Sequence, residues 1–228
     1  MPKSALEKYQ FKPFIGSSHH WALQHIEKID PSTNVLDIGC GSSAIGSILK
    51  ERNFSSLHAV EIDEKAYQNA QGIYHRVAKE LDEVSDRKYG LILLLDVIEH
   101  MQNPEEYLVE VVKLLNPGGM LFISVPNVAH WSVRIPLLFG YFNYTDRAIL
   151  DRTHLQFFTK SRFKKLLSEQ KDTRIFEMSA SIEPAEFVLP KVIWDNLVFQ
   201  EVSKLRVKFA SLFPGLMAYQ HLAVVKKI

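Results

Sequence analysis

The sequence predicts an α/β protein built on a doubly wound, mainly parallel sheet. Three observations support this prediction. Apolar runs of strand length alternate with segments of helical spacing, a glycine turn joins the first run to its helix, and one run is apolar at every position. Three strand and helix units follow one another between residues 34 and 126. In open sheets of this kind, ligands bind at the carboxyl ends of the strands.

The first two units are short and carry clear boundary signals. A strand over residues 35–38 passes through a glycine turn into a helix, where Ile45, Ile48 and Leu49 recur at helical spacing. A second strand over residues 57–61 follows, and Asp63 is placed to cap a helix that begins at Glu64. The strand and helix pattern therefore repeats.

The third unit contains the most apolar run of the chain. Residues 91–95 are all Leu or Ile, which predicts a central strand covered on both faces. Asn103 offers a helix cap before Pro104, a residue suited to the first helical position. The Asn-Pro-Gly-Gly run at 116–119 is expected to stop that helix, and residues 120–125 to form the next strand.

Beyond Pro126 the regular alternation of strand and helix signals ends. Residues 127–160 are rich in aromatic residues and turn formers, which indicates a cover over the core. A helix around Phe163, a strand over 174–178, a helical stretch over 187–213 and a final strand over 219–225 complete the chain. We expect one domain over residues 1–228. Its parts are an N-terminal arm (1–33), a core (34–126), an aromatic lid (127–160), a helical insertion before the last strand (185–214) and a closing strand (217–228).

Composition narrows the class of protein. The 228 residues are 46% hydrophobic and 23% charged, which excludes a disordered or collagen-like chain. With 27 basic and 26 acidic residues, the chain has no net field to hold a nucleic acid. No apolar run approaches the ~20 residues of a spanning helix, so we expect no membrane insertion. The lone Cys40 excludes an internal disulfide and suits a cytoplasmic location.

The glycine turn predicts a nucleotide-like ligand. Residues 39–44 (Gly-Cys-Gly-Ser-Ser-Ala) fit the pattern G-x-G-x-x-G/A, whose glycines let the backbone turn sharply and approach a ligand. Glu61 follows Gly41 by twenty residues, at the end of the second strand, where a carboxylate can accept both hydroxyls of a ribose. An adenosine-containing ligand is expected.

Asp37 discriminates between two such ligands. A carboxylate two residues before Gly39 would repel the pyrophosphate of a dinucleotide across a short gap. S-adenosyl-L-methionine instead brings an ammonium and a sulfonium, which a carboxylate attracts. The turn therefore favours the methyl donor over NAD.

Four motifs in order resemble those of class I S-adenosylmethionine-dependent methyltransferases. They are the Val-Leu-Asp-Ile-Gly-Cys-Gly run at 35–41, Glu61, the Asp-Val-Ile-Glu-His run at 96–100, and the Asn-Pro-Gly-Gly turn at 116–119 with its following strand. The similarity covers roughly residues 15–180 and is greatest to the small-molecule branch, which includes ubiquinone-biosynthesis O-methyltransferases and methionine-biosynthesis accessory proteins. The resemblance implies a Rossmann-like sheet of seven strands, mainly parallel, with an antiparallel last strand.

The resemblance also implies which residues hold the donor. Asp37 and the glycine turn would line its methionine half, Glu61 its ribose and Ile62 its adenine, and two residues after the central strand would lie beside it. The implied donor residues are Asp37, Gly39, Cys40, Gly41, Glu61, Ile62, Asp96 and Val97. Two positions depart from the family pattern. Ser43 replaces the third glycine, and the acid that in the family meets the adenine amine after the third strand has no clear match in residues 76–81.

The acceptor site is expected near the lid. A base is needed only if the nucleophile is protonated, and an unperturbed imidazole titrates near pH ~6.5. His100 and His154 are therefore the catalytic candidates, while Tyr141, Tyr144 and Arg152 are candidates for contact with a small-molecule acceptor. No metal is assigned.

Two questions remain open from the sequence. The helical insertion carries an apolar stripe beside Lys204 and Lys208, which predicts packing on the lid, on a second copy of the chain or against a membrane surface. The function with most support is methyl transfer to a small molecule, with an O-methyl product. The alternative is an accessory protein that binds the donor and regulates a partner enzyme.

Overall fold

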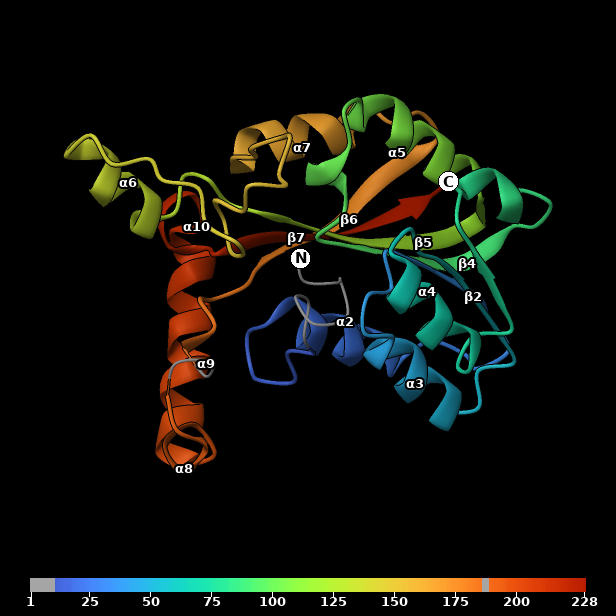
Figure 1. Ribbon diagram of the computed structural model, residues 1–228, viewed down its shortest axis with the longest axis horizontal. Helices are drawn as coiled ribbons and strands as arrows, with labels where there is room; N and C mark the ends of the chain where they lie inside the picture. Colours follow the sequence, from blue (N-terminus) through green and yellow to red (C-terminus); the bar gives the residue numbers. More distant parts are fainter. Residues whose placement is uncertain (1–10, 186–188) are drawn as a thin grey trace.

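The computed structural model describes residues 11–185 and 189–228 and contains a seven-stranded sheet with helices on both faces (Figure 1). The strand order is β3-β2-β1-β4-β5-β7-β6. Strands β1 to β5 pair in parallel, whereas β7 runs antiparallel to both neighbours, β5 and β6. The predicted doubly wound α/β fold, mainly parallel with an antiparallel last strand, is confirmed. The strands are β1 (Asn34–Ile38), β2 (Ser56–Val60), β3 (Arg76–Ala78), β4 (Tyr89–Leu95), β5 (Leu115–Pro126), β6 (Thr173–Ala180) and β7 (Gln220–Lys227).

The central strand β4 separates two apolar layers. Leu91 and Leu93 belong to one core cluster, while Ile92 and Leu94 belong to the other, and all four are fully buried. Because successive side chains of a strand point to opposite faces, a strand covered on both sides must be apolar throughout. The prediction of a doubly covered strand at residues 91–95 is confirmed.

Helices cover both faces and end where local signals place them. Figure 1 shows α2, α3 and α4 on one side of the sheet and α5 and α7 on the other. Asp63 caps α4 by accepting the amide hydrogen of Ala66 at 3.0 Å. Asn103 precedes α5 but its side chain accepts no cap bond, and its amide instead donates to Glu106 at 3.2 Å. The helices are α2 (Ser18–Ile26), α3 (Ala44–Glu51), α4 (Glu64–Gln71), η1 (Leu81–Val84), η2 (Ile98–His100), α5 (Pro104–Lys113), α6 (Trp131–Leu138) and α7 (Lys160–Ser168).

The Asn-Pro-Gly-Gly run lies inside β5 as an irregular stretch without register partners in β4 or β7. Strand β5 starts at Leu115 and includes residues 116–119, and the pairing with β4 shifts register between Tyr89 and Leu91. A Cβ on Gly119 would lie 3.0 Å from the Tyr89 carbonyl oxygen, so only glycine lets the two backbones approach there. Strand β5 therefore begins five residues before the expected start, but its continuous pairing with β4 and β7 begins at Met120, as predicted.

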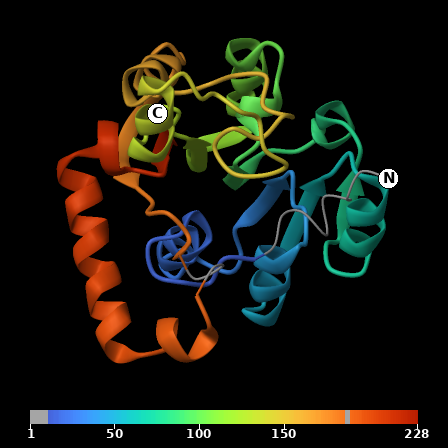
Figure 2. The same cartoon turned by 60° about the vertical axis from the view of Figure 1, so that its left-hand side comes forward.

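The C-terminal helices lie at one end of the sheet. They are α8 (Lys191–Trp194), α9 (Leu197–Leu212) and α10 (Pro214–Met217), and they precede β7. Figures 1 and 2 both show α9 as a long helix at the periphery of the molecule. Residues 1–10 of the expected arm and 186–188 of the expected insertion lie outside the described residues.

Candidate functional site

The turn after β1 is held in a conformation that requires glycine. Gly39 has φ +70° and Gly41 has φ +51°, both in the left-handed region. A Cβ on Gly39 would lie 2.6 Å from Cγ2 of Val97, so the turn and the segment after β4 are in close contact. The predicted donor residues on these two segments are therefore neighbours.

Ser43, which replaces the third glycine of the family pattern, adopts the left-handed backbone conformation that a glycine would allow. It has φ +58°, stands as the N-cap residue of α3 and is fully buried. Its hydroxyl lies 3.7 Å from the sulfur of Cys40. A left-handed serine costs roughly 1–2 kcal/mol, so the surrounding contacts must over-determine this conformation.

Glu61 is fixed beneath the glycine turn. Its side chain is buried, one carboxylate oxygen accepts the amide hydrogen of Gly41 at 2.8 Å, and the other accepts that of Asp63 at 2.9 Å. Oε1 keeps a further lone pair, and among the described residues the only other neighbour of Oε2 is the Cys40 thiol, a weak donor 4.0 Å away, so the carboxylate can also accept the two hydroxyls of a ribose. Next to it, the Ile62 side chain is 79% exposed and offers an apolar surface for a base. These residues fit an adenosine ligand.

Asp37 is buried and has a partner that the sequence did not reveal. The Tyr74 hydroxyl donates a hydrogen bond to the Asp37 carboxylate at 2.5 Å. A Cβ on Gly46 would lie 2.2 Å from the Tyr74 ring, so Gly46 makes room for this tyrosine. Burial raises the pKa of Asp37 to about 6, against the lowering effect of the bond from Tyr74, and nearby Glu61 raises it further. Asp37 is therefore charged above pH 6.

The buried charge of Asp37 is expected to lower the stability of the fold while it strengthens donor binding. Because the pKa of Asp37 is raised on folding, its effect on the free energy of unfolding is most favourable below the unfolded pKa of 3.8. This favourable effect is lost as the pH rises through about 6. We expect Asp37→Asn to raise the free energy of unfolding at pH 8 by on the order of 1–3 kcal/mol, while donor affinity falls. Urea unfolding at pH 5 and pH 8 tests this, and a variant no more stable than wild type at pH 8 contradicts it.

Cys40 contributes to the turn through its backbone. Its thiol is buried, and burial together with Asp37 raises the pKa of Cys40 far above its ordinary value. The sulfur faces Ser43 and Glu61 inside the core. We therefore expect thiol reagents to react slowly with Cys40 whether or not a ligand is bound.

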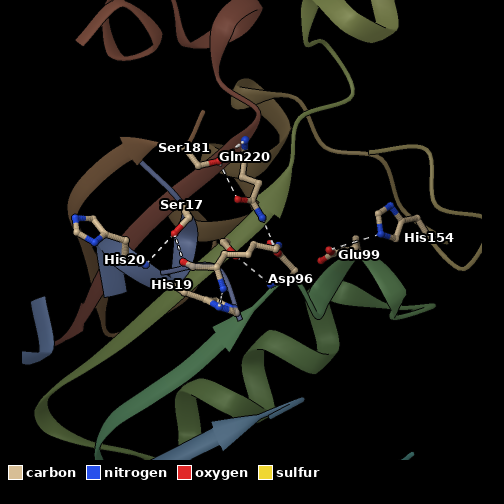
Figure 3. A network of polar contacts seen from close by, with 10 residues as sticks. Ser17, His19, His20, Asp96, Glu99, His154, Ser181 and Gln220 are labelled. Carbon is tan, nitrogen blue, oxygen red and sulfur yellow. Dashed lines mark hydrogen bonds and ion pairs between the residues drawn. The ribbon is translucent and has the colours of Figure 1, made fainter. Parts of the chain in front are cut away.

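Asp96 joins segments that are far apart in the sequence. It has φ +56°, and its carboxylate accepts a hydrogen bond from the Ser124 hydroxyl at 2.6 Å and another from the amide of Gln220. Lys12 of the N-terminal arm lies 3.5 Å away. Burial raises the pKa of Asp96, but Lys12 and the bond from Ser124 outweigh it, and the pKa lies below its ordinary value. Figure 3 shows Asp96 between Gln220 and the arm.

The two predicted bases lie together. The rings of His100 and His154 are 4.8 Å apart, centroid to centroid. Nδ1 of His154 lies 3.0 Å from the carbonyl oxygen of Ile149, and Nδ1 of His100 lies 3.0 Å from that of Thr153. Since a carbonyl only accepts, each Nδ1 carries the hydrogen and each Nε2 carries a lone pair. Both imidazoles are thus arranged to receive a proton at Nε2.

Glu99 completes this cluster, although sequence reasoning gave it no role. Its carboxylate is fully buried without a hydrogen-bond partner, and one oxygen lies 3.9 Å from Nε2 of His154 (Figure 3). Burial and the charge of Asp96 raise the pKa of Glu99 well above its ordinary range. Burial and the neighbouring His100 lower the pKa of His154. A neutral imidazole beside a carboxyl group is suited to proton transfer at neutral pH.

The same three side chains could also hold a cation. Glu99, His100 and His154 each offer one ligand atom, and these atoms all lie within 4.8 Å of one another. Carboxylate and imidazole are common ligands of divalent metals. Among residues 11–185 and 189–228, this is the one such group of three.

The predicted acceptor residues lie at the surface, in the segment between α6 and α7. The side chains of Tyr141 and Tyr144 are mostly exposed, and Tyr144 packs against Phe157 with ring centroids 6.4 Å apart. Arg152 pairs with Asp146 at 3.0 Å on the surface. Their contact with an acceptor stays a prediction.

Comparison with known proteins gives consistent matches. A family described as a methyltransferase domain matches residues 17–170. A curated relative, the ubiquinone biosynthesis O-methyltransferase of Rickettsia felis, is 26% identical over 154 residues, covering 54% of this chain and 63% of the relative. The chain spans less than two thirds of the length of the curated relatives that match first.

Solved structures support the fold. An S-adenosylmethionine-dependent methyltransferase from Archaeoglobus fulgidus aligns with a TM-score of 0.58 at 21% identity, covering 93% of this chain and 95% of that one. Magnesium protoporphyrin IX methyltransferase from Synechocystis, solved with bound S-adenosylhomocysteine, aligns with a TM-score of 0.61 at 14% identity, covering 92% and 84%. In the part of the chain that the structure describes, no helix has the length and apolarity needed to cross a membrane.

Proposed function

Because the chain belongs to the methyltransferase domain family, whose donor is S-adenosyl-L-methionine, we propose that it transfers the donor's methyl group to a hydroxyl of a small molecule. The observation that carries this proposal is the pairing of two features at one edge of the sheet. A glycine turn backed by the buried Glu61 lies at the ends of β1 and β2. His100, which follows the end of β4, lies beside His154 from the segment between α6 and α7 and near the buried Glu99.

The donor would be held by residues of three neighbouring strands. Gly39 and Gly41 allow the backbone to approach its methionine half, and the Asp37 carboxylate attracts the nearby cations. Glu61 would accept the ribose hydroxyls, and the exposed Ile62 would pack on the adenine. When bound, the donor supplies an electrophilic methyl group on a sulfonium. The residues of the chain supply position and charge, which account for much of the rate in a displacement of this kind.

The histidine pair would remove the acceptor's proton. As the hydroxyl oxygen attacks the methyl carbon, an O–C bond forms, the C–S bond breaks and the sulfur leaves as a neutral thioether. The hydroxyl proton passes to Nε2 of His154 or His100, so the positive charge of the sulfonium ends on the imidazole. Because its pKa is raised, the buried Glu99 beside His154 starts as a neutral carboxyl group, so it would stabilise that imidazolium only by giving up its own proton.

The acceptor is proposed to be an apolar, ring-containing molecule that carries a hydroxyl. Two observations support this class: the exposed aromatic rings of Tyr141 and Tyr144 on the lid, and the names of the curated relatives, which are ubiquinone biosynthesis O-methyltransferases. A cytoplasmic location is part of the proposal, and the free thiol of Cys40 is consistent with it.

The test is methyl transfer from donor labelled in the methyl group to a panel of hydroxylated aromatic compounds. We expect label in an ether product, formed at wild-type rate by protein treated with a chelator. Activity that disappears with chelator and returns with a divalent metal would assign the Glu99 cluster to a cation instead of a base. Donor binding with no turnover on any acceptor, together with a stable protein partner, would favour the accessory role.

A further inference from the structure

Helix α9 turns its small residues inward and its large apolar residues outward. Ser203 and Ala210 are its two buried residues, and Val207 lies between them on the same face. Val207 and Ala210 pack in a small cluster with Ile182. This is the reverse of the usual arrangement, in which the large apolar side chains of a surface helix face the protein.

The outward residues form a narrow and regular stripe, which we call the α9 seam. It consists of Val198, Val202, Leu205, Phe209 and Leu212, which are between 46% and 74% exposed. Leu197 beside the seam is 78% exposed. Their spacing is four, three, four and three, the alternation that places residues in a seam between paired helices. A helix that lies on a membrane instead has a wide apolar face opposite a strongly basic one.

The charged residues beside the α9 seam are arranged so that two copies of the chain can pair with opposite charges facing each other. Glu201 and Lys208 are seven residues apart and lie along the same edge of the seam, one toward each end. In an antiparallel helix pair, equivalent edges face each other, so Glu201 of each copy lies near Lys208 of the other. On the opposite edge, Arg206 is already engaged with Glu183 at 3.1 Å. Glu201 contacts Lys204 of its own helix at 2.6 Å, but an exposed ion pair of this kind contributes little and leaves Glu201 able to pair across the interface. The charge pattern thus favours a second copy of this chain over an unrelated partner.

We propose that the α9 seam pairs antiparallel with the α9 seam of a second copy, forming a two-fold symmetric dimer with Leu205 near its axis. A two-fold contact is closed and uses the same surface on both subunits. Sixteen residues of helix span about 24 Å, so the seam alone buries less than the roughly 800 Å² per partner of a standard interface. The dimer is therefore expected to dissociate on dilution. This proposal does not depend on the proposed reaction.

Sedimentation equilibrium over a wide concentration range tests the dimer. Wild type is expected to approach twice the 26.2 kDa of one chain at high concentration. Leu205→Glu should weaken association about tenfold or more, because it places two carboxylates at the axis without partners. Val109→Glu is the matched control. Val109 is an exposed apolar residue of α5, and its replacement should leave association unchanged.

Charge exchange tests the antiparallel register. Lys208→Glu should weaken association, and adding Glu201→Lys to it should restore much of the loss, because the pairs are re-formed with opposite sign. Wild type that stays monomeric at every concentration, or a Leu205→Glu variant that associates like wild type, would overturn the proposal. So would a monomer that floats with vesicles of phosphatidylglycerol and phosphatidylcholine and loses this binding in Leu205→Glu.

Discussion

Replacing His154 by asparagine is expected to lower kcat by roughly 10²–10⁴-fold while donor affinity stays within about twofold of wild type. Asparagine can still donate a hydrogen bond to the Ile149 carbonyl, now made by Nδ1 of His154, but it has no group in place of Nε2. The variant therefore removes the proton acceptor and keeps the local bond. Initial rates at saturating donor, with donor affinity from calorimetry, make the comparison.

Two controls make this test specific. His25→Asn is matched, because Nδ1 of His25 also lies 2.9 Å from a backbone carbonyl, that of Trp21, and it belongs to the N-terminal helix. Its kcat should stay near wild type. His100→Asn should lower kcat if His100 is the base. Wild-type rates in both His100 and His154 variants would show that positioning alone suffices.

Gly39→Val is expected to weaken donor binding by more than about 100-fold. Valine at φ +70° is strained, and its Cβ would lie 2.6 Å from Cγ2 of Val97, so the turn must move away from the segment after β4. Both segments contact the donor in the proposed function. Calorimetric titration of S-adenosyl-L-methionine measures the loss.

The folded state of that variant has to be verified. Gly72→Val is the matched control, because Gly72 has an ordinary negative φ and the nearest atom to an added Cβ is 3.7 Å away. This control should bind the donor like wild type. If Gly39→Val melts cooperatively and binds with wild-type affinity, the glycine turn is not the donor site.

Local signals were enough to predict the elements that hold the site. The apolar run of β4, the cap at Asp63 and the positive-φ glycines act over a few neighbouring residues, so their consequences can be read from short segments. Asn103 is the N-cap residue of α5, as predicted, but its side chain makes no cap bond and instead donates to Glu106. A residue of suitable type at a helix start does not fix its own rotamer.

Long-range partners within the site could not be predicted in this way. Tyr74 reaches Asp37 across 37 positions of sequence, and Gln220 reaches Asp96 across 124. Such contacts depend on how β7 and the loop after α4 pack, which no local pattern encodes. Glu99 stood in a motif that the sequence analysis quoted, but its complete burial is a property of the folded chain alone.

The periodicity of α9 shows the same division. The spacing of Val198, Val202 and Leu205 predicted a helix with an apolar stripe, and the helix is present. Periodicity cannot say which face turns inward. The structure places Ser203 and Ala210 inside and the stripe outside, because the small residues allow α9 to approach the cluster around Ile182 closely.

Calorimetry can show whether the turn after β1 and Glu61 hold S-adenosyl-L-methionine. S-adenosyl-L-methionine and NAD are each titrated into wild type and into Glu61→Ala by calorimetry. We expect saturable binding of S-adenosyl-L-methionine to wild type, at least roughly tenfold weaker binding to Glu61→Ala, and no binding of NAD. Binding of NAD by wild type, or equal affinity of both proteins for S-adenosyl-L-methionine, would contradict it.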